Sequence, residues 1–393
     1  MKYLYILTVI ALYCASCSIL YAQEQELKLK DDNLLKFEFA FANEAYGTKG
    51  DFLLDSPRNI STTRNNDIVV FDDVYIKIYD SKGNGKKILG GKGQGPGEFD
   101  NMYTFMYSTS PSDYFTILES EYFTVYDNNF KFINKKRIRN DTAINKFLEM
   151  NNHTYKDIYS HREMYFILEN EKLYMFMHMS KPHHSMNVLL YDNNKTGEIK
   201  PLIYTEDPRT KTTSDDGKFV SVSALWGRLL YIPLPNRLLA YTNSDEEVFK
   251  DGRGYYKIHI MSIDDLSEKM VITKDFTPKK YPDNFIEDYK KRPGMSKETE
   301  AYIKKRVYEP YLWGLKSDSL YIFANKETVI KIGKMSYYTY DVFDSRNGKY
   351  LSTFTTTKFL SYVRNGYGYV IGTHSNGYNE IQVYKLDPKI YGK

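Results

Sequence analysis

Apolar and variable residues alternate with a period of two along most of this chain, in short runs that often end in an aromatic residue and aspartate. Alternation closed by Asp, Asn or Gly is typical of a β-strand that runs into a tight turn. The aspartates at these ends are expected to stabilise the turns through their side chains. The runs begin at Ile76, Phe123, Val188 and Tyr340, with degenerate copies at Ile258 and Ile381.

A second apolar strand precedes each copy, so each pair predicts a β-hairpin. These strands begin at Asp67, Tyr114, Lys172, Arg237, Ser319 and Tyr367. Candidate flanking strands extend the pairs, and a four-stranded antiparallel unit repeated about six times predicts an all-β, six-bladed β-propeller. A single blade cannot bury both of its faces, so the units must stack in series.

The longest interruption separates the fourth and fifth units, at residues 283–308, and it predicts two short helices. Asp283 and Ser296 are candidate N-caps, and Pro293-Gly294 ends the first helix. Acidic residues come early and basic residues late in the second, which complements a helix dipole. We expect this helical insertion on the rim of one propeller face.

The segment Leu34–Phe41 alternates like a strand but lies before the first unit. We expect it to complete the last blade, whose C-terminal strands end near Val383 and Leu386. Such a pairing would join the two chain ends and leave no exposed sheet edge. Residues 23–393 then form one propeller domain.

The composition fits a globular β protein, with 42% hydrophobic residues, 26% charged residues and 38 tyrosines among 393 residues. The formal net charge is only +4, and basic residues are interleaved with acidic ones. Nothing here resembles the concentrated basic face of a nucleic-acid-binding protein.

The N-terminal 22 residues have the features of an export signal: Lys2 is followed by the apolar run Tyr3–Leu12. Two cleavage sites compete. Ala15-Ser16-Cys17 resembles a bacterial lipobox, which implies lipidation of Cys17, whereas ordinary cleavage would follow Ala22. Both predict an extracytoplasmic protein, in the periplasm or at the outer membrane. The chain has no cysteine after Cys17, so the folded domain has no disulfide.

The stretch GGKGQGPGEFDN, from Gly90 to Asn101, matches neither a Walker A loop nor a dinucleotide-binding fingerprint. It resembles the inter-blade turn of NHL-type six-bladed propellers, a likeness that covers the first blade and is faint afterwards. The resemblance implies that Gly93, Gly95 and Gly97 permit positive φ, that Pro96 stiffens the turn, and that Phe99 is a wedge in the core between blades. Exported bacterial propellers, often lipoproteins, show the same single strong copy.

Candidate chemistry is sparse. The seven histidines form no paired-ligand motif, and no nucleophile motif occurs, so no metal site, cofactor or catalytic residue is predicted. A divalent cation in the central channel stays open, because its ligands would come from several blades. Candidate ligand-binding residues lie near blade entrances or, for the two tryptophans, at inner-strand positions that face the channel; the alternative is that both tryptophans pack in the blade core. The candidates are Trp226, Arg228, Trp313, Arg58 and Arg364.

These observations favour a non-enzymatic binding module for an unidentified protein or glycan, anchored to a membrane if Cys17 is lipidated. One alternative is a metal-dependent, lactonase-like hydrolase or lyase. Another is a structural subunit of a cell-envelope complex that docks through residues 283–308. Fold likeness alone does not separate these functions.

Overall fold

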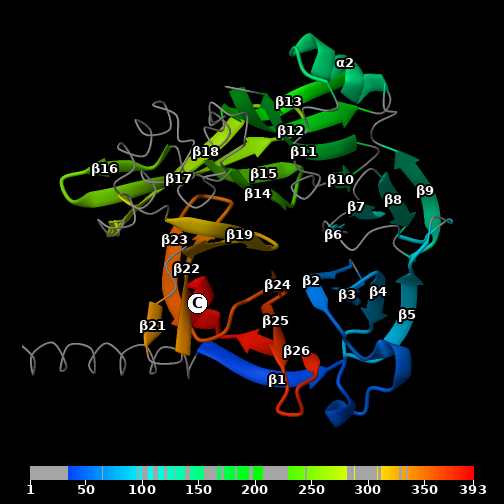
Figure 1. The fold of residues 1–393 in the computed structure, drawn as a ribbon. Coiled ribbons are helices and arrows are strands. Elements are labelled where there is room, and N and C mark those ends of the chain that lie inside the picture. The colour runs from blue at the N-terminus through cyan, green and yellow to red at the C-terminus, as the bar shows by residue number, and fades with distance from the viewer. Residues whose placement is uncertain are drawn as a thin grey trace, which may run out of the picture. The chain divides into compact units, whose positions relative to one another are not determined.

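The computed structural model describes residues 34–393 with internal gaps, of which the longest are 155–165, 207–228 and 288–307. The fold is all-β, with mostly four-stranded antiparallel sheets (Figure 1). The described strands form six sheets. Each predicted hairpin is the central pair of one of them.

Sheets 1 to 3 each contain four strands in chain order. Sheet 1 consists of β2 (Pro57–Thr62), β3 (Ile68–Asp72), β4 (Tyr75–Tyr79) and β5 (Gly85–Gly90). Sheet 2 consists of β6 (Phe105–Ser108), β7 (Tyr114–Leu118), β8 (Tyr122–Asp127) and β9 (Phe132–Arg137). Sheet 3 consists of β10 (Phe166–Glu169), β11 (Lys172–Lys181), β12 (His184–Asn193) and β13 (Glu198–Glu206).

Sheets 4 and 5 depart from the prediction, because each has five strands. Sheet 4 consists of β14 (Leu229–Leu234), β15 (Leu238–Asn243), β16 (Val248–Lys250), β17 (Arg253–Ser262) and β18 (Glu268–Phe276). Sheet 5 consists of β19 (Leu312–Asp318), β20 (Tyr321–Lys326), β21 (Ile330–Ile332), β22 (Met335–Asp344) and β23 (Tyr350–Thr356). The additional strands β16 and β21 pair with the first residues of β17 and β22.

Sheet 6 joins the first described strand to the last ones, as the sequence predicted. It has the order β1-β26-β25-β24, with β1 (Leu35–Phe41), β24 (Tyr362–Arg364), β25 (Tyr367–Thr373) and β26 (Asn379–Leu386). The N–H of Asp387 also donates to the carbonyl oxygen of Leu34 at 2.9 Å. The start of the described chain is therefore tied to its end.

The chain groups into two compact units. One comprises Ala40–Tyr311 and Ile371–Ile381; the other comprises residues up to Phe39, Leu312–Val370 and Gln382–Lys393. Within the first unit, the edge strands β2, β6 and β10 neighbour one another, and within the second β19 neighbours β24. The edge strands of sheets 1 to 3 thus follow one another side by side, and so do those of sheets 5 and 6.

One helix in the described residues was not predicted. Helix α2 (Thr142–Met150) follows sheet 2 and buries Ile144, Phe147 and Leu148 on one face. After its last residue the chain turns at Asn152, whose φ of 57° is left-handed, and the N–H of His153 donates back to the carbonyl oxygen of Leu148 at 2.7 Å. The i, i+3, i+4 spacing of the three apolar residues was the available signal.

The predicted turn aspartates have the expected role where the structure describes them. Asp80 Oδ1 accepts the N–H groups of Lys82 at 2.8 Å and Asn84 at 2.9 Å. Asp127 makes the equivalent pair of bonds in sheet 2. Desolvation would raise the pKa of Asp80, but the side-chain amide of Asn84, which donates to Asp80 Oδ2 at 2.8 Å, and then the two backbone bonds outweigh it, so the pKa is lowered. The aspartates close hairpins and are not a set of catalytic carboxylates.

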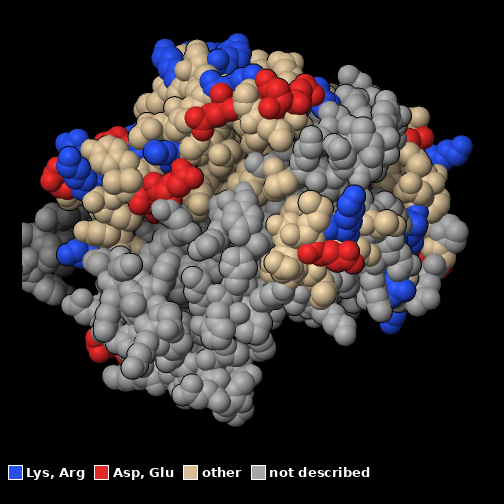
Figure 2. Space-filling view, turned by 90° about the horizontal axis from the view of Figure 1, so that it is seen from above, with Lys and Arg blue, Asp and Glu red and all other residues tan. Residues whose placement is uncertain are grey.

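Two further features bear on the sequence predictions. No helix among the described residues is long and apolar enough to cross a membrane. On the face drawn in Figure 2, Lys and Arg side chains lie interspersed with Asp and Glu, in keeping with the net charge of +4. Cys17, Ala22 and nearly all of the predicted helical insertion at 283–308 lie outside the described residues.

Candidate functional site

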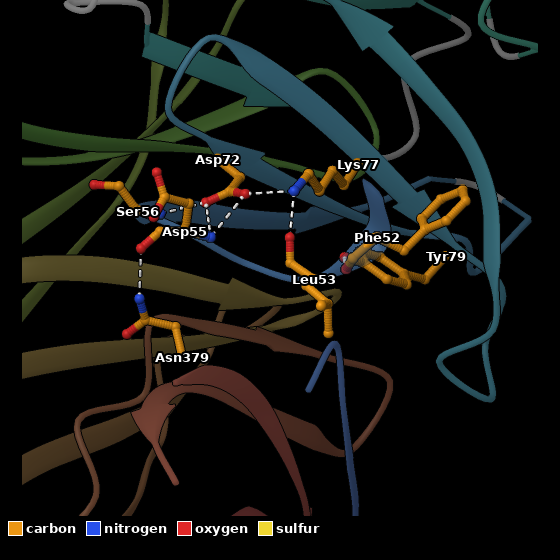
Figure 3. Close-up of polar contacts among 8 residues, drawn as sticks. All are labelled: Phe52, Leu53, Asp55, Ser56, Asp72, Lys77, Tyr79 and Asn379. Atoms are coloured by element: carbon orange, nitrogen blue, oxygen red, sulfur yellow. Dashed lines mark hydrogen bonds and ion pairs between the residues drawn. The ribbon is translucent and has the colours of Figure 1, made fainter. Parts of the chain in front are cut away.

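A buried carboxylate and a buried ammonium hold the segment that leads into β2 (Figure 3). Asp72, at the end of β3, is 1% exposed. Its Oδ1 accepts the backbone N–H groups of Asp55 at 3.0 Å and Ser56 at 2.6 Å. Lys77 Nζ, from β4, lies 2.7 Å from Asp72 Oδ2 and also donates to the carbonyl oxygen of Leu53.

Tyr79 and Asn379 fix the same segment at either side. The phenol of Tyr79 donates to the carbonyl oxygen of Phe52 at 2.6 Å, and Asn379 Nδ2 donates to that of Asp55 at 2.6 Å. Burial, and then the charge of Asp72, raise the pKa of Tyr79 well above its usual range, so the phenol stays protonated. The donors and acceptors satisfy one another, so this cluster positions the start of β2 and its Arg58.

The glycine-rich stretch is a turn whose N–H groups bond within the chain. Gly91 donates to the carbonyl oxygen of Val74 at 3.1 Å, and Gly93 to that of Phe99 at 3.0 Å. The N–H of Gly95 donates to the carboxylate of Glu98 at 2.9 Å. The carboxylate of Glu98 thus takes the position that a bound phosphate would need at this N–H. Phosphate binding here is not supported.

Phe99 at the end of this turn lies in the apolar core. Its side chain is fully buried, in a cluster formed by β3, β4, β7 and β8. The cluster therefore fills the space between sheets 1 and 2 with one aromatic ring from the turn. Its other buried members are Val69, Phe71, Ile76, Ile78, Ile117, Tyr126 and Phe130.

The predicted role of the glycines needs a correction. Only Gly97 of the three has positive φ, at 81°, whereas Gly93 and Gly95 do not; Gly90 and Gly91 do, at 91° and 116°. Gly93 and Gly95 instead leave room for the folded-back Glu98, whose carboxylate a Cβ on Gly93 would meet at 2.0 Å. Pro96 lies outside the described residues.

The predicted ligand-binding residues that the structure describes all lie on edge strands of their sheets. Arg58 is on β2, Trp313 on β19 and Arg364 on β24. Trp313 and Arg364 belong to the same unit and to neighbouring strands, whereas Arg58 belongs to the other unit. Trp226 and Arg228 lie outside the described residues, just before β14.

Trp313 is 44% exposed and sits at a β-bulge. In the register of β19 with β20, Leu312 opposes Lys326 and Gly314 opposes Asn325, so Trp313 is the additional residue. A bulge re-aims the side chain that it carries. Trp313 is therefore not packed in the core, and its ring is partly exposed to solvent.

Lys316 and Phe359 are site candidates that sequence reasoning missed. Lys316 follows on the same strand, and its Nζ lies 5.1 Å from the ring centroid of Phe359, which is 36% exposed. Burial lowers the pKa of Lys316 to about 8. No local motif marks this pair, because Phe359 approaches from the loop between β23 and β24. We call Trp313, Lys316 and Phe359 the β19 site.

His259 on β17 is held by two carboxylates and an aromatic ring. Its Nδ1 lies 2.6 Å from a carboxylate oxygen of Glu268, and its Nε2 lies 2.7 Å from one of Glu246. The ring stacks on Tyr241 with centroids 4.8 Å apart. The two carboxylates approach opposite ring nitrogens, so the three groups do not converge on one point. Within the described ranges, no cluster of three or more His, Cys, Asp or Glu side chains is arranged to hold a metal ion.

No family model and no curated protein sequence matches this chain. Solved structures that it resembles include XC5397 from Xanthomonas campestris, a gluconolactonase, at a TM-score of 0.39 and 9% identity over 90% of this chain and 95% of that one. The AfRom2 CNH domain has a TM-score of 0.34 and 6% identity over 84% and 94%.

A third resemblance is to the extracellular domain of BT4673 from B. thetaiotaomicron, with a TM-score of 0.38 and 10% identity over 86% of this chain. This chain spans 35% of the length of that domain. Likenesses at these TM-scores carry no functional argument, so the proposals below rest on the residues themselves.

Proposed function

We propose that this chain is an exported six-bladed β-propeller that binds a ligand at the β19 site and does not catalyse a reaction. Three features support the propeller. Six sheets follow one another in the chain, the edge strand β6 neighbours β2 and β10 while β19 neighbours β24, and β1 joins the sheet of the C-terminal strands. In a propeller, first strands line the central funnel, where ligands bind.

The observation that carries the binding function is the exposed ring of Trp313 on such a first strand. Large aromatic side chains usually bury their rings, and a tryptophan held outward by a bulge offers a flat apolar face with a polar N–H. Lys316 adds a positive charge three residues further on. An aromatic platform beside a few polar groups is the usual composition of a ligand site.

Arrays of glycans and peptides test this function. We expect the purified mature protein to bind members of one class and Trp313→Ala to reduce that binding at least tenfold. Tyr378→Ala is the matched control, because it removes a ring that is 57% exposed but lies outside the first strands. Equal binding by the two variants would sink the proposal. A lactonase-like enzyme would instead turn over lactones or esters in a cation-dependent way.

Export and lipid anchoring are proposed from the N-terminal segment, in which Cys17 follows two small residues. Labelled palmitate should be incorporated into the wild-type protein in a bacterial host and not into Cys17→Ser. Labelling of neither protein, with a mature chain that begins at Gln23, would show that cleavage follows Ala22.

A further inference from the structure

Lys316 is a half-buried cation without an anion. Among the described residues its ammonium has no hydrogen bond and no ion pair. Its contact there is a cation–π contact, in which Nζ lies 5.1 Å from the ring centroid of Phe359. Lys77 is the contrast within the same chain, since it is buried against Asp72 at 2.7 Å. Burying an uncompensated charge is costly, and the lowered pKa of Lys316 reflects that cost.

A buried acceptor without a donor lies on the neighbouring strand. Asn325 on β20 is 2% exposed, and its Oδ1 has no hydrogen-bond partner. Native structures satisfy the large majority of buried polar atoms, so each exception needs an explanation. Asn325 opposes Gly314 in the strand register, and Phe323 opposes Lys316.

The cation and the acceptor share one face of sheet 5. Residues two apart on a strand point the same way, so Lys316, Gly314 and the opposing Asn325 belong to that face. Gly314 has no side chain to separate them, and a Cβ built there would come within 4.0 Å of Lys316 Nζ. The two unpartnered groups therefore lie over the same small area.

Aromatic rings border this area. Phe359 contacts Tyr338 edge-on, with centroids 5.2 Å apart and an interplanar angle of 61°. Tyr340 on β22 opposes Asn325 on β20. Tyr338 precedes Tyr340 by two residues, so Tyr338 lies on the same face of the sheet as Asn325. Trp313 is three residues before Lys316, or about 10 Å along the strand.

We propose that Lys316 and Asn325 form a subsite for a carboxylate-bearing saccharide. This inference rests on the proposed binding function of the β19 site. The ammonium supplies the missing partner of a carboxylate, and the amide oxygen accepts a hydrogen bond from a sugar hydroxyl. The rings of Phe359 and Trp313 present apolar faces to the C–H face of a sugar ring. An acidic peptide offers the carboxylate but neither the dense hydroxyl groups nor the apolar C–H face of a sugar ring.

Two probes that differ only in the carboxylate test the subsite: methyl β-D-glucuronide and methyl β-D-glucoside, titrated into the full mature protein and followed by NMR. We expect the glucuronide to bind at least tenfold more tightly. Lys316→Met should lower its affinity to that of the glucoside, Lys316→Arg should retain most of it, and Asn325→Leu should weaken both sugars. Thermal midpoints of the variants establish that they fold.

The outcomes separate this inference from the proposed function. Equal affinity for the two sugars, with binding that depends on Trp313, would overturn the subsite and leave the binding function standing. Tighter binding of an Asp/Glu-rich peptide than of the glucuronide would overturn the saccharide class. Binding of neither sugar, together with no Trp313-dependent signal on the arrays, would overturn both proposals.

Discussion

At the residue scale, the pairing of buried charges separates structural from functional groups. Lys77 is buried and Lys316 is half-buried, and among the described residues only Lys77 of the two has a carboxylate partner. The first lysine closes a network that fixes a backbone segment. The second lysine keeps a positive charge that no carboxylate neutralises, at a half-buried position. An anionic ligand that binds there would gain affinity from this single charge.

The Asp72–Lys77 pair should be essential for stability because removing one partner leaves the other charge buried. We expect Asp72→Asn and Lys77→Met each to lower the free energy of unfolding by about 3–5 kcal/mol. The double variant should lose less than the sum of the two, since neither charge is then left alone. Urea denaturation measures all three.

The exposed pair Lys269–Asp265, with a 3.0 Å contact, is the control. Asp265→Asn should change the free energy of unfolding far less than Asp72→Asn does, because solvent screens that pair. Additive losses in the Asp72–Lys77 double variant would show that the two groups act independently, contrary to the network described above.

At the scale of elements, sequence patterns predicted those strands and turns that are determined by residues close to one another in the chain. The six hairpins were correct because alternation and turn aspartates act within one or two strands. Strands β16 and β21 were missed because each has three residues and pairs only with the overhanging start of a ten-residue strand. Lys316 was missed because its partners come from β20 and from the loop after β23.

The turn at Gly90 shows which glycine the fold requires. A Cβ there would meet the ring of Phe99 at 2.3 Å and the carbonyl oxygen of Val74 at 2.7 Å, at a φ of 91°. Gly90→Ala should therefore displace the wedge of sheets 1 and 2 and lower the free energy of unfolding by about 3 kcal/mol or more. The midpoint of chemical denaturation measures the loss.

Gly252 is the matched control for that substitution. It has a φ of 75° but nothing within 4 Å of a built Cβ. Gly252→Ala should cost only the backbone strain, about 1–2 kcal/mol. If both variants lost the same amount, backbone conformation alone would explain the effect, and the close packing of Phe99 on Gly90 would not matter.

At the scale of the whole molecule, the long connection between β18 and β19 raises the question of whether the fold depends on it. Its ends are held together inside one unit. Lys280 and Tyr308 form an antiparallel bridge, and Tyr308 stacks on Phe249 with centroids 4.4 Å apart. Beyond it, the N–H of Tyr311 donates to Glu247 at 3.0 Å, and its ring stacks on Phe276 at 3.8 Å.

Because these contacts already close the connection, residues 282–306 should be dispensable for folding. Replacing them with a short Gly-Ser linker should shift the thermal midpoint by only a few degrees, since loop closure depends weakly on length. Binding that depends on Trp313 should persist. Tyr308→Ala in the full chain should cost more stability than the excision, because it removes the anchoring ring itself. If the shortened protein failed to fold, the segment would be part of the core. If it folded and bound its ligand but lost a cell-envelope partner, the segment would be a docking surface.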